Sequence, residues 1–185
     1  MIGKVDVGTD SHLQLKGKSL MDIFDFAMKM ELDGKDFYTR LATESNCQGL
    51  KQIFADLAAD EQKHYEIFSR LKAQQPLAGM ADSRALETAR NLFAELKVDL
   101  SSGNGLGSNL EAYRYAMKVE KESETIYLEA AEKEENEEVR KLLLKIVVEE
   151  RKHYNIIENI YDFVSAPTQS LVWAEATNLD EFKFE

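Results

Sequence analysis

The chain has 185 residues, which is enough for one domain with a sizeable core, and its 44% hydrophobic and 31% charged residues are typical of a soluble globular protein. Its net charge of −11 argues against binding to nucleic acid or anionic membranes, because such binding relies on Lys and Arg side chains, and it favours the attraction of cations. Cys47 is the single cysteine, which excludes an internal disulfide, a Cys-x-x-Cys metal site and an iron–sulfur cluster within these residues.

The N-terminal segment, residues 1–18, lacks hydrophobic periodicity and contains three glycines, so we expect a flexible tail. It has no apolar stretch of the kind that signal peptides carry, and no run of 18 apolar residues occurs in the chain. We therefore expect neither a signal peptide nor a membrane span, and we expect a cytoplasmic location.

Hydrophobic periodicity and the helix-stopping residues that interrupt it predict one helical domain over residues 19–165. Its four long helices are expected at approximately residues 19–45, 47–74, 108–135 and 136–165. Asn136 is the expected N-cap of the last helix, with Glu137 and Glu138 favourably placed in its first turn. The links within the first pair and within the last pair are short, so each pair should form an antiparallel hairpin.

A long connection, residues 75–107, separates the two hairpins. It contains an expected short amphipathic helix, residues 81–96, before a linker rich in Gly, Ser and Asn, residues 99–109. Helices of roughly 27 residues span about 40 Å, which such a connection can cross, leaving the second and third long helices parallel. We therefore predict an all-α fold, a ferritin-like four-helix bundle of two antiparallel hairpins joined by a long crossover with a short extra helix.

The C-terminal segment, residues 166–185, contains the single tryptophan, Trp173, together with Phe182 and Phe184. This aromatic content indicates a tail that packs, either on its own bundle or on a neighbouring chain. With the acidic surface, it suggests a homodimer.

One motif occurs twice, 89 residues apart, without a gap. Residues 27–38 (AMKMELDGKDFY) correspond to residues 116–127 (AMKVEKESETIY), and residues 61–65 (EQKHY) correspond to residues 150–154 (ERKHY). Each half therefore supplies a lone Glu on one helix and a Glu-x-x-His on the next. Four-helix bundles build two-metal carboxylate sites from this ligand set.

The candidate ligands all lie on the apolar faces of their predicted helices, and they are Glu31, Glu61, His64, Glu120, Glu150 and His153. Unpaired carboxylates are costly to bury, so their convergence in one core is expected where cations neutralise them. Mixed carboxylate and imidazole ligation favours iron or manganese in a redox role. We expect two iron ions per chain, with manganese or a mixed pair as alternatives.

The spacing of Glu and His places both side chains on one helix face, so that the carboxylate can bridge two metals while the imidazole binds one. We expect Glu61 and Glu150 to bridge. The other four ligands should complete the two metals in pairs, Glu31 with His64 and Glu120 with His153. A metal-free bundle with a protonated or hydrogen-bonded polar core is the alternative.

Two tyrosines, Tyr38 and Tyr127, lie seven residues after Glu31 and Glu120, two turns further along the same faces. They are candidate hydrogen-bond donors to the ligands. They are equally compatible with ordinary core tyrosines.

These motifs resemble those of the rubrerythrin branch of the ferritin-like superfamily, over residues 20–164. The resemblance implies a non-haem di-iron centre that reacts with hydrogen peroxide or dioxygen and is held by the six residues above. A typical rubrerythrin also has a rubredoxin-like iron site made by two Cys-x-x-Cys pairs, which this chain cannot form. The chain is similar to the short members that lack the rubredoxin domain, which implies an external electron donor such as a rubredoxin-like protein.

The sequence differs from the rubrerythrin pattern at one position of the third long helix. Rubrerythrins carry a further carboxylate three residues after the lone Glu of this helix, and it takes part in a redox-linked exchange of iron ligands. That position is Ser123 here. Glu124 follows on a nearby face and is a candidate replacement.

The expected function is that of a di-iron oxidoreductase with an oxidative-stress or iron-oxidation role. The alternatives are a ferroxidase or iron-handling protein, an oxygenase of an organic substrate, and a metal-binding helical scaffold without turnover. An oxygenase would need a larger apolar pocket beside the metals.

Overall fold

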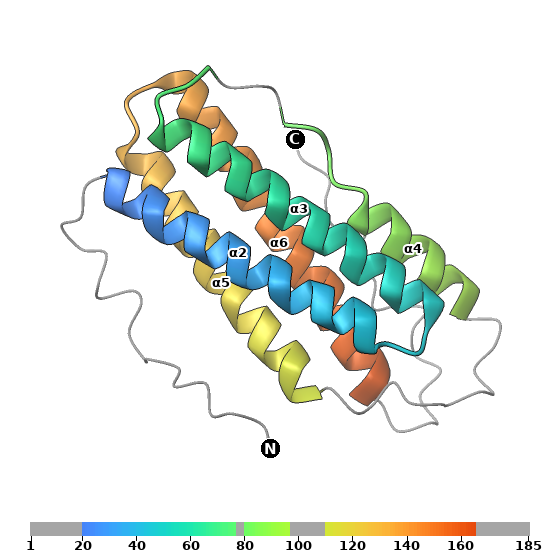
Figure 1. Cartoon of the computed structure of the whole chain (residues 1–185). Helices are drawn as coiled ribbons and strands as arrows, with labels where there is room; N and C mark the ends of the chain where they lie inside the picture. Colours follow the sequence, from blue (N-terminus) through green and yellow to red (C-terminus); the bar gives the residue numbers. More distant parts are fainter. Residues whose placement is uncertain (1–19, 77–79, 97–109, 166–185) are drawn as a thin grey trace.

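The chain forms an elongated bundle of helices, shown by the computed structural model in Figure 1. The structure describes residues 20–76, 80–96 and 110–165. Its long helices are α2 (Leu20–Glu44), α3 (Gln48–Lys72), α5 (Leu110–Lys133) and α6 (Glu137–Ser165), and the short α4 (Ala85–Leu96) lies between α3 and α5 in the chain. The predicted all-α bundle with a short crossover helix is confirmed. The expected tails, residues 1–18 and 166–185, and the linker at residues 99–109 lie outside the described residues.

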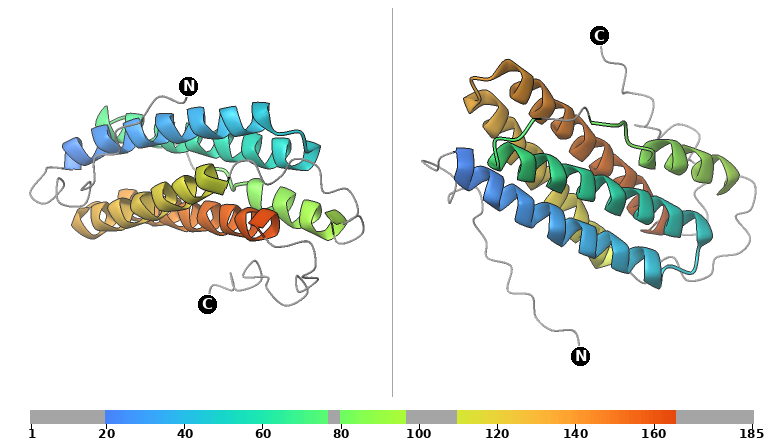
Figure 2. Two further views of the ribbon diagram at one scale, coloured as in Figure 1. Left: turned by 90° about the horizontal axis from the view of Figure 1, so that it is seen from below. Right: turned by 45° about the horizontal axis from the view of Figure 1, so that its top comes forward.

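The bundle consists of two layers, each made by one hairpin. Figure 2 shows α2 and α3 in one layer and α5 and α6 in the other. The helices of each hairpin are antiparallel, while α3 and α5 run in the same direction, as the long crossover requires (Figure 1). Helix α4 packs against α3 and α6, so the crossover covers the side of the bundle where these two helices meet.

Asn136 marks the point at which α6 begins after the turn of the second hairpin. The Asn136 side chain accepts hydrogen bonds from the backbone N–H groups of Glu138 at 2.9 Å and Val139 at 3.3 Å. These are donors that the first turn of a helix leaves unpaired, so Asn136 is the N-cap of α6 as expected. Two acidic residues in the first turn of α6 also favour its positive end.

The apolar core is divided into two clusters, one at each end of the bundle. One cluster is centred on Phe54, Tyr113 and Ile157, and the other on Phe68 and Ile146. Between them lies a layer of buried polar side chains. The clusters hold the four helices in register, which fixes the level at which the polar side chains meet. Within the described part of the chain, no helix is long and apolar enough to cross a membrane.

Several side-chain contacts attach the described part of the crossover to the bundle. Lys145 on α6 donates to the Met80 carbonyl at 2.8 Å and pairs with Asp82 at 2.9 Å. Further along, Thr88 on α4 donates to a carboxylate oxygen of Asp56 on α3 at 2.6 Å. At the start of α3, Gly49 lies against the Leu92 side chain of α4.

The close approach of α3 and α4 predicts a specific packing defect. A methyl group at Gly49 would lie 2.2 Å from Leu92 Cδ1 and 2.9 Å from its Cγ. Gly49→Ala should therefore lower the free energy of unfolding by about 1–3 kcal/mol, measured by urea denaturation. Gly49→Ala combined with Leu92→Ala should lose less than the sum of the two single changes, because the shorter side chain makes room. Strict additivity would contradict this packing.

Candidate metal centre

The buried polar layer contains two groups of side chains that could each hold a metal ion. One group is Glu31, Glu61, His64 and Glu150, and the other is Glu61, Glu120 and His153. Within each group, one donor atom per residue lies within 4.8 Å of the others. No member is more than 3% exposed. The structure thus brings together all six ligands predicted from the sequence, and Glu61 is shared by both groups.

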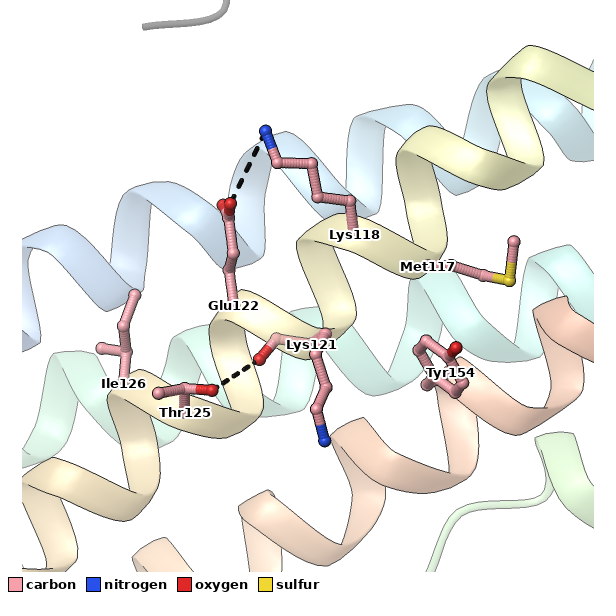
Figure 3. A pocket seen from close by; sticks show the side chains of 7 residues that line it. All are labelled: Met117, Lys118, Lys121, Glu122, Thr125, Ile126 and Tyr154. Carbon is pink, nitrogen blue, oxygen red and sulfur yellow. Dashed lines mark hydrogen bonds and ion pairs between the residues drawn. The ribbon is translucent and has the colours of Figure 1, made fainter. Parts of the chain in front are cut away.

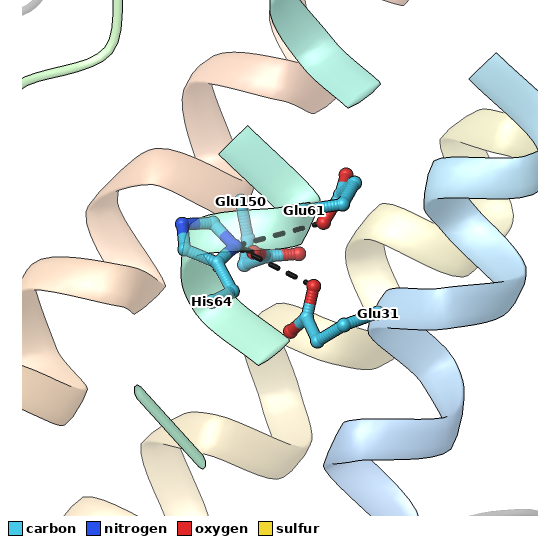
Figure 4. Close-up of side chains that lie close together, drawn as sticks. All are labelled: Glu31, Glu61, His64 and Glu150. Atoms are coloured by element: carbon cyan, nitrogen blue, oxygen red, sulfur yellow. Dashed lines mark ion pairs between the residues drawn. The ribbon is translucent and has the colours of Figure 1, made fainter. Parts of the chain in front are cut away.

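Each imidazole directs its Nδ1 atom into its own group. The Nδ1 atom of His64 lies 2.8 Å from a Glu150 oxygen, 3.5 Å from a Glu31 oxygen and 3.6 Å from a Glu61 oxygen. Figure 4 shows this nitrogen facing the carboxylates. The Nδ1 atom of His153 lies 3.3 Å from the other Glu61 oxygen and 3.7 Å from a Glu120 oxygen. The two groups therefore lie side by side, with Glu61 between them.

These side chains fit a pair of cations. The Nδ1 atoms of His64 and His153, the Nε2 atom of His153 and one oxygen of Glu150 are buried without a hydrogen-bond partner. Buried polar atoms in native proteins are nearly always paired, so the two Nδ1 atoms and the Glu150 oxygen, which face the two groups, need a ligand. Carboxylate oxygens and imidazole nitrogens are donors that suit iron and manganese. The donor set therefore matches the two-metal site expected from the sequence.

A second pair of carboxylates lies behind the histidines. The Nε2 atom of His64 lies 3.1 Å from Glu149, and that of His153 lies 3.5 Å from Asp60. Each partner belongs to the opposite helix, since Glu149 is on α6 and Asp60 on α3. A carboxylate at Nε2 favours the tautomer with its proton there, which leaves the Nδ1 lone pair free for a metal.

Sequence reasoning did not find Asp60 and Glu149. A signal existed, because the two residues are also 89 positions apart and directly precede Glu61 and Glu150. The repeat does not reveal which histidine each of them contacts. Each residue lies one turn before the histidine of its own helix, yet it contacts the histidine of the other helix.

The tyrosines also reach across the bundle. Tyr38 on α2 donates its hydroxyl hydrogen bond to Glu120 on α5, and Tyr127 on α5 donates to Glu31 on α2. Burial, together with the neighbouring carboxylates, raises the pKa of both tyrosines well above the ordinary value, so the hydroxyls stay protonated. Each tyrosine therefore orients a carboxylate of the opposite hairpin rather than the Glu of its own helix.

Protons and metal ions compete for the site. Burial and the neighbouring Glu61 raise the pKa of Glu150 to about 8, and burial with Glu150 and Glu61 raises that of Glu31. Burial alone would lower the pKa of His64 and His153, but the surrounding carboxylates raise both overall. In the absence of metal, Glu31, Glu150 and the two histidines therefore hold their protons more tightly than usual, and a metal ion must displace these protons.

The position of the further carboxylate that the sequence resemblance implies on the third long helix is occupied by Ser123, which is buried beside the site. Glu124 belongs to neither metal-binding group of the described residues. Its carboxylate accepts from Arg151 at 2.6 and 3.0 Å and pairs with Lys121 at 2.7 Å. Glu124 therefore does not replace the carboxylate missing at Ser123 in this arrangement.

A small cavity of about 40 Å³ connects the site to the face formed by α2 and α5. Gly34 and Ser123 line it, three residues after Glu31 and Glu120 respectively. A volume of roughly 10–15 Å³ on this scale accommodates one water, so the cavity admits a molecule of a few atoms and not an organic substrate.

A larger hollow, of about 440 Å³, lies over α5 and is shown in Figure 3. Its lining includes Met117, Lys121 and Tyr154 and none of the six candidate ligands. The large apolar pocket that an oxygenase would need is therefore not found at this hollow.

The fold and the buried donor set define the class, a ferritin-like four-helix bundle with a carboxylate and histidine centre. The family model for rubrerythrin matches residues 22–161. The chain therefore belongs to the rubrerythrin family, whose members typically bind iron. Neither a curated protein nor a solved structure matches the sequence.

The raised pKa values predict that the metal-free protein loses stability as the pH rises. Glu150 titrates near its ordinary value of 4.5 in the unfolded chain and at about 8 in the folded one, so the folded state holds the extra proton between these values. The histidines act in the same direction above 6.5. The free energy of unfolding should fall by about 1.4 kcal/mol per pH unit for each extra proton, measured by urea denaturation of metal-free protein between pH 5 and 9.

Substitution by glutamine should have opposite effects at a carboxylate whose pKa is raised and at one whose pKa is lowered. Glu150→Gln should stabilise the metal-free protein at pH 9, where the buried Glu150 carboxylate is ionised and destabilises the folded state. At pH 5, where this carboxyl is protonated, the substitution should change the stability little. The pKa of Glu61 is instead lowered, because the neighbouring Glu31 carboxyl and the two imidazoles favour its ionised form by more than burial disfavours it. Glu61→Gln should therefore destabilise the metal-free protein at pH 7. Equal effects of the two changes at every pH would refute this division.

Proposed function

We propose that the chain is a di-iron oxidoreductase that reduces hydrogen peroxide or dioxygen with electrons from an external donor. The observation that carries the proposal is the pair of buried groups that share Glu61, with unpaired imidazole nitrogens directed into them. The family match supports iron as the metal. Reduction of one peroxide to two waters takes up two electrons and two protons, so the donor must supply two electrons in each cycle.

The proposed roles of the ligands follow from the two groups. Glu31 and His64 would hold one ion, Glu120 and His153 would hold the other, and Glu61 would be shared by both. Bridging by Glu150 stays a prediction, since this residue lies in the first group only. When bound, the iron pair supplies the electrons that reduce the oxidant.

The residues around the ligands keep this site oriented and dry. Tyr38 and Tyr127 each bond one oxygen of a ligand carboxylate, which leaves the other oxygen for the metal. Asp60 and Glu149 hold the imidazoles from behind. The narrow cavity between α2 and α5 excludes larger molecules, which supports peroxide or dioxygen as the oxidant.

A ferroxidase or iron-handling role is the second candidate, and Ser123 favours it. The resemblance associates peroxidase activity with a carboxylate at this position, and the chain lacks it. The two candidates differ in the fate of the iron, because a peroxidase retains its two ions through turnover and an iron-handling protein releases them. The external donor, the homodimer and the cytoplasmic location stay predictions.

Oxidation kinetics test the proposed function. Protein loaded anaerobically with two ferrous ions per chain should be oxidised by peroxide or dioxygen at least about tenfold faster than free ferrous ion, followed by stopped-flow absorbance. Glu61→Ala should lose this acceleration. The matched control is Glu66→Ala, which removes an exposed carboxylate from the same helix. Rates no faster than free ferrous ion with both oxidants would sink the proposal.

The cavity predicts a steric effect on the same reaction. A methyl group at Gly34 would lie 3.5 Å from Glu61 Cγ and Cδ, an ordinary contact, whereas the two further carbons of a valine would take up part of the cavity that Gly34 lines. Gly34→Val should slow oxidation by about tenfold or more while two ions remain bound, and Gly34→Ala should slow it less. Unchanged rates in Gly34→Val, with metal retained, would show that the oxidant enters elsewhere.

A further inference from the structure

One residue of the crossover contacts both carboxylates that lie behind the histidines. The Ser83 hydroxyl donates a hydrogen bond to Asp60 on α3. Its backbone N–H donates to Glu149 on α6 at 3.3 Å. Asp60 and Glu149 are each 1% exposed, so water has almost no access to them and their partners must come from the protein.

Through these two carboxylates, Ser83 is connected to both imidazoles. Asp60 lies 3.5 Å from His153 Nε2, and Glu149 lies 3.1 Å from His64 Nε2. The path runs from the crossover to a carboxylate, then to an imidazole, and then to one of the two metal-binding groups. A shift of Ser83 would therefore alter the direction of both Nδ1 atoms.

The position of Ser83 is itself fixed. Its hydroxyl oxygen accepts from the Ala85 N–H at 3.1 Å, at the start of α4, while its proton is given to Asp60. Lys145 holds the preceding residues through the Met80 carbonyl and the Asp82 carboxylate. Both the donor and the acceptor direction of the hydroxyl are thus used, so the side chain has one orientation.

The two hydrogen bonds that Ser83 donates come from different groups, one from its backbone and one from its side chain. Glu149 receives a backbone N–H, which any residue other than proline would supply. Asp60 receives the side-chain hydroxyl, which only a serine or threonine supplies in this geometry. Lys63 also contacts Asp60, at 2.6 Å, but it is on the same helix and its side chain is 35% exposed. A change of side chain at Ser83 should therefore affect one half of the metal centre and spare the other.

We propose that Ser83 is a positioning residue of the metal centre, whose hydroxyl orients His153 through Asp60 and whose backbone N–H orients His64 through Glu149. The inference rests on the proposed metal-binding role of the two histidines. It makes the crossover part of the site, on the side opposite the cavity that opens between α2 and α5.

Metal titration of the full chain tests the proposal. Ferrous ion should bind to Ser83→Ala with one affinity unchanged and the other about 10–100-fold weaker, measured by anaerobic calorimetry on metal-free protein. Ser83→Thr keeps the hydroxyl and should restore both affinities. Thr88→Val is the matched control, because it removes another contact between the crossover and α3 without touching Asp60. The double variant Ser83→Ala/Asp60→Asn should be no weaker than Asp60→Asn alone.

A second readout needs no metal. The chain has three histidines, so their imidazole signals can be resolved by nitrogen-detected NMR of the metal-free protein. In Ser83→Ala the Nε2 signal of His153 should shift while that of His64 stays. Wild-type affinities and unshifted signals in Ser83→Ala, or identical changes in Thr88→Val, would overturn the proposal. Failure of the wild type to bind two ions would instead refute the proposed function, and the NMR comparison would still decide the role of Ser83.

Discussion

The structure depends on the burial of four carboxylates and two imidazoles between two apolar clusters. Burying such groups as unneutralised charges costs folding free energy. Water cannot solvate them, because no member is more than 3% exposed. In the metal-free protein, Glu31, Glu150 and the two histidines hold protons more tightly than usual, and bound cations would take the place of these protons. The same helices that provide the apolar ends of the bundle therefore provide a site whose stability is linked to metal binding.

The contacts that support the ligands join one hairpin to the other. Tyr38 and Asp60 come from the α2–α3 hairpin and contact side chains of α5 and α6, while Tyr127 and Glu149 make the reverse connections. The arrangement follows the internal repeat, so each half orients the ligands of the other. The crossover adds Ser83 to this network on one side, whereas the opposite side keeps a narrow opening at Gly34.

The sequence predicted the helices, the connectivity and the six converging side chains, because these follow from periodicity and from a repeated spacing. It did not predict contacts that depend on tertiary packing. The positions of Tyr38 and Tyr127 indicated donors to the site but not that each crosses to the opposite hairpin. Asp60 and Glu149 read as ordinary acidic residues beside the motif. Ser83 falls in the helix predicted over residues 81–96, whereas α4 begins at Ala85 and leaves Ser83 in the segment before it. Glu124 is adjacent to Ser123 in sequence, yet Arg151 binds it outside the two groups.

The most direct test of this account is the metal content of the chain, measured by elemental analysis after anaerobic loading with ferrous iron and desalting. The account predicts two irons per wild-type chain and a loss of most of this metal in Glu61→Ala, because Glu61 belongs to both groups. Near-zero iron and manganese in the wild type, or two retained ions in Glu61→Ala, would contradict it.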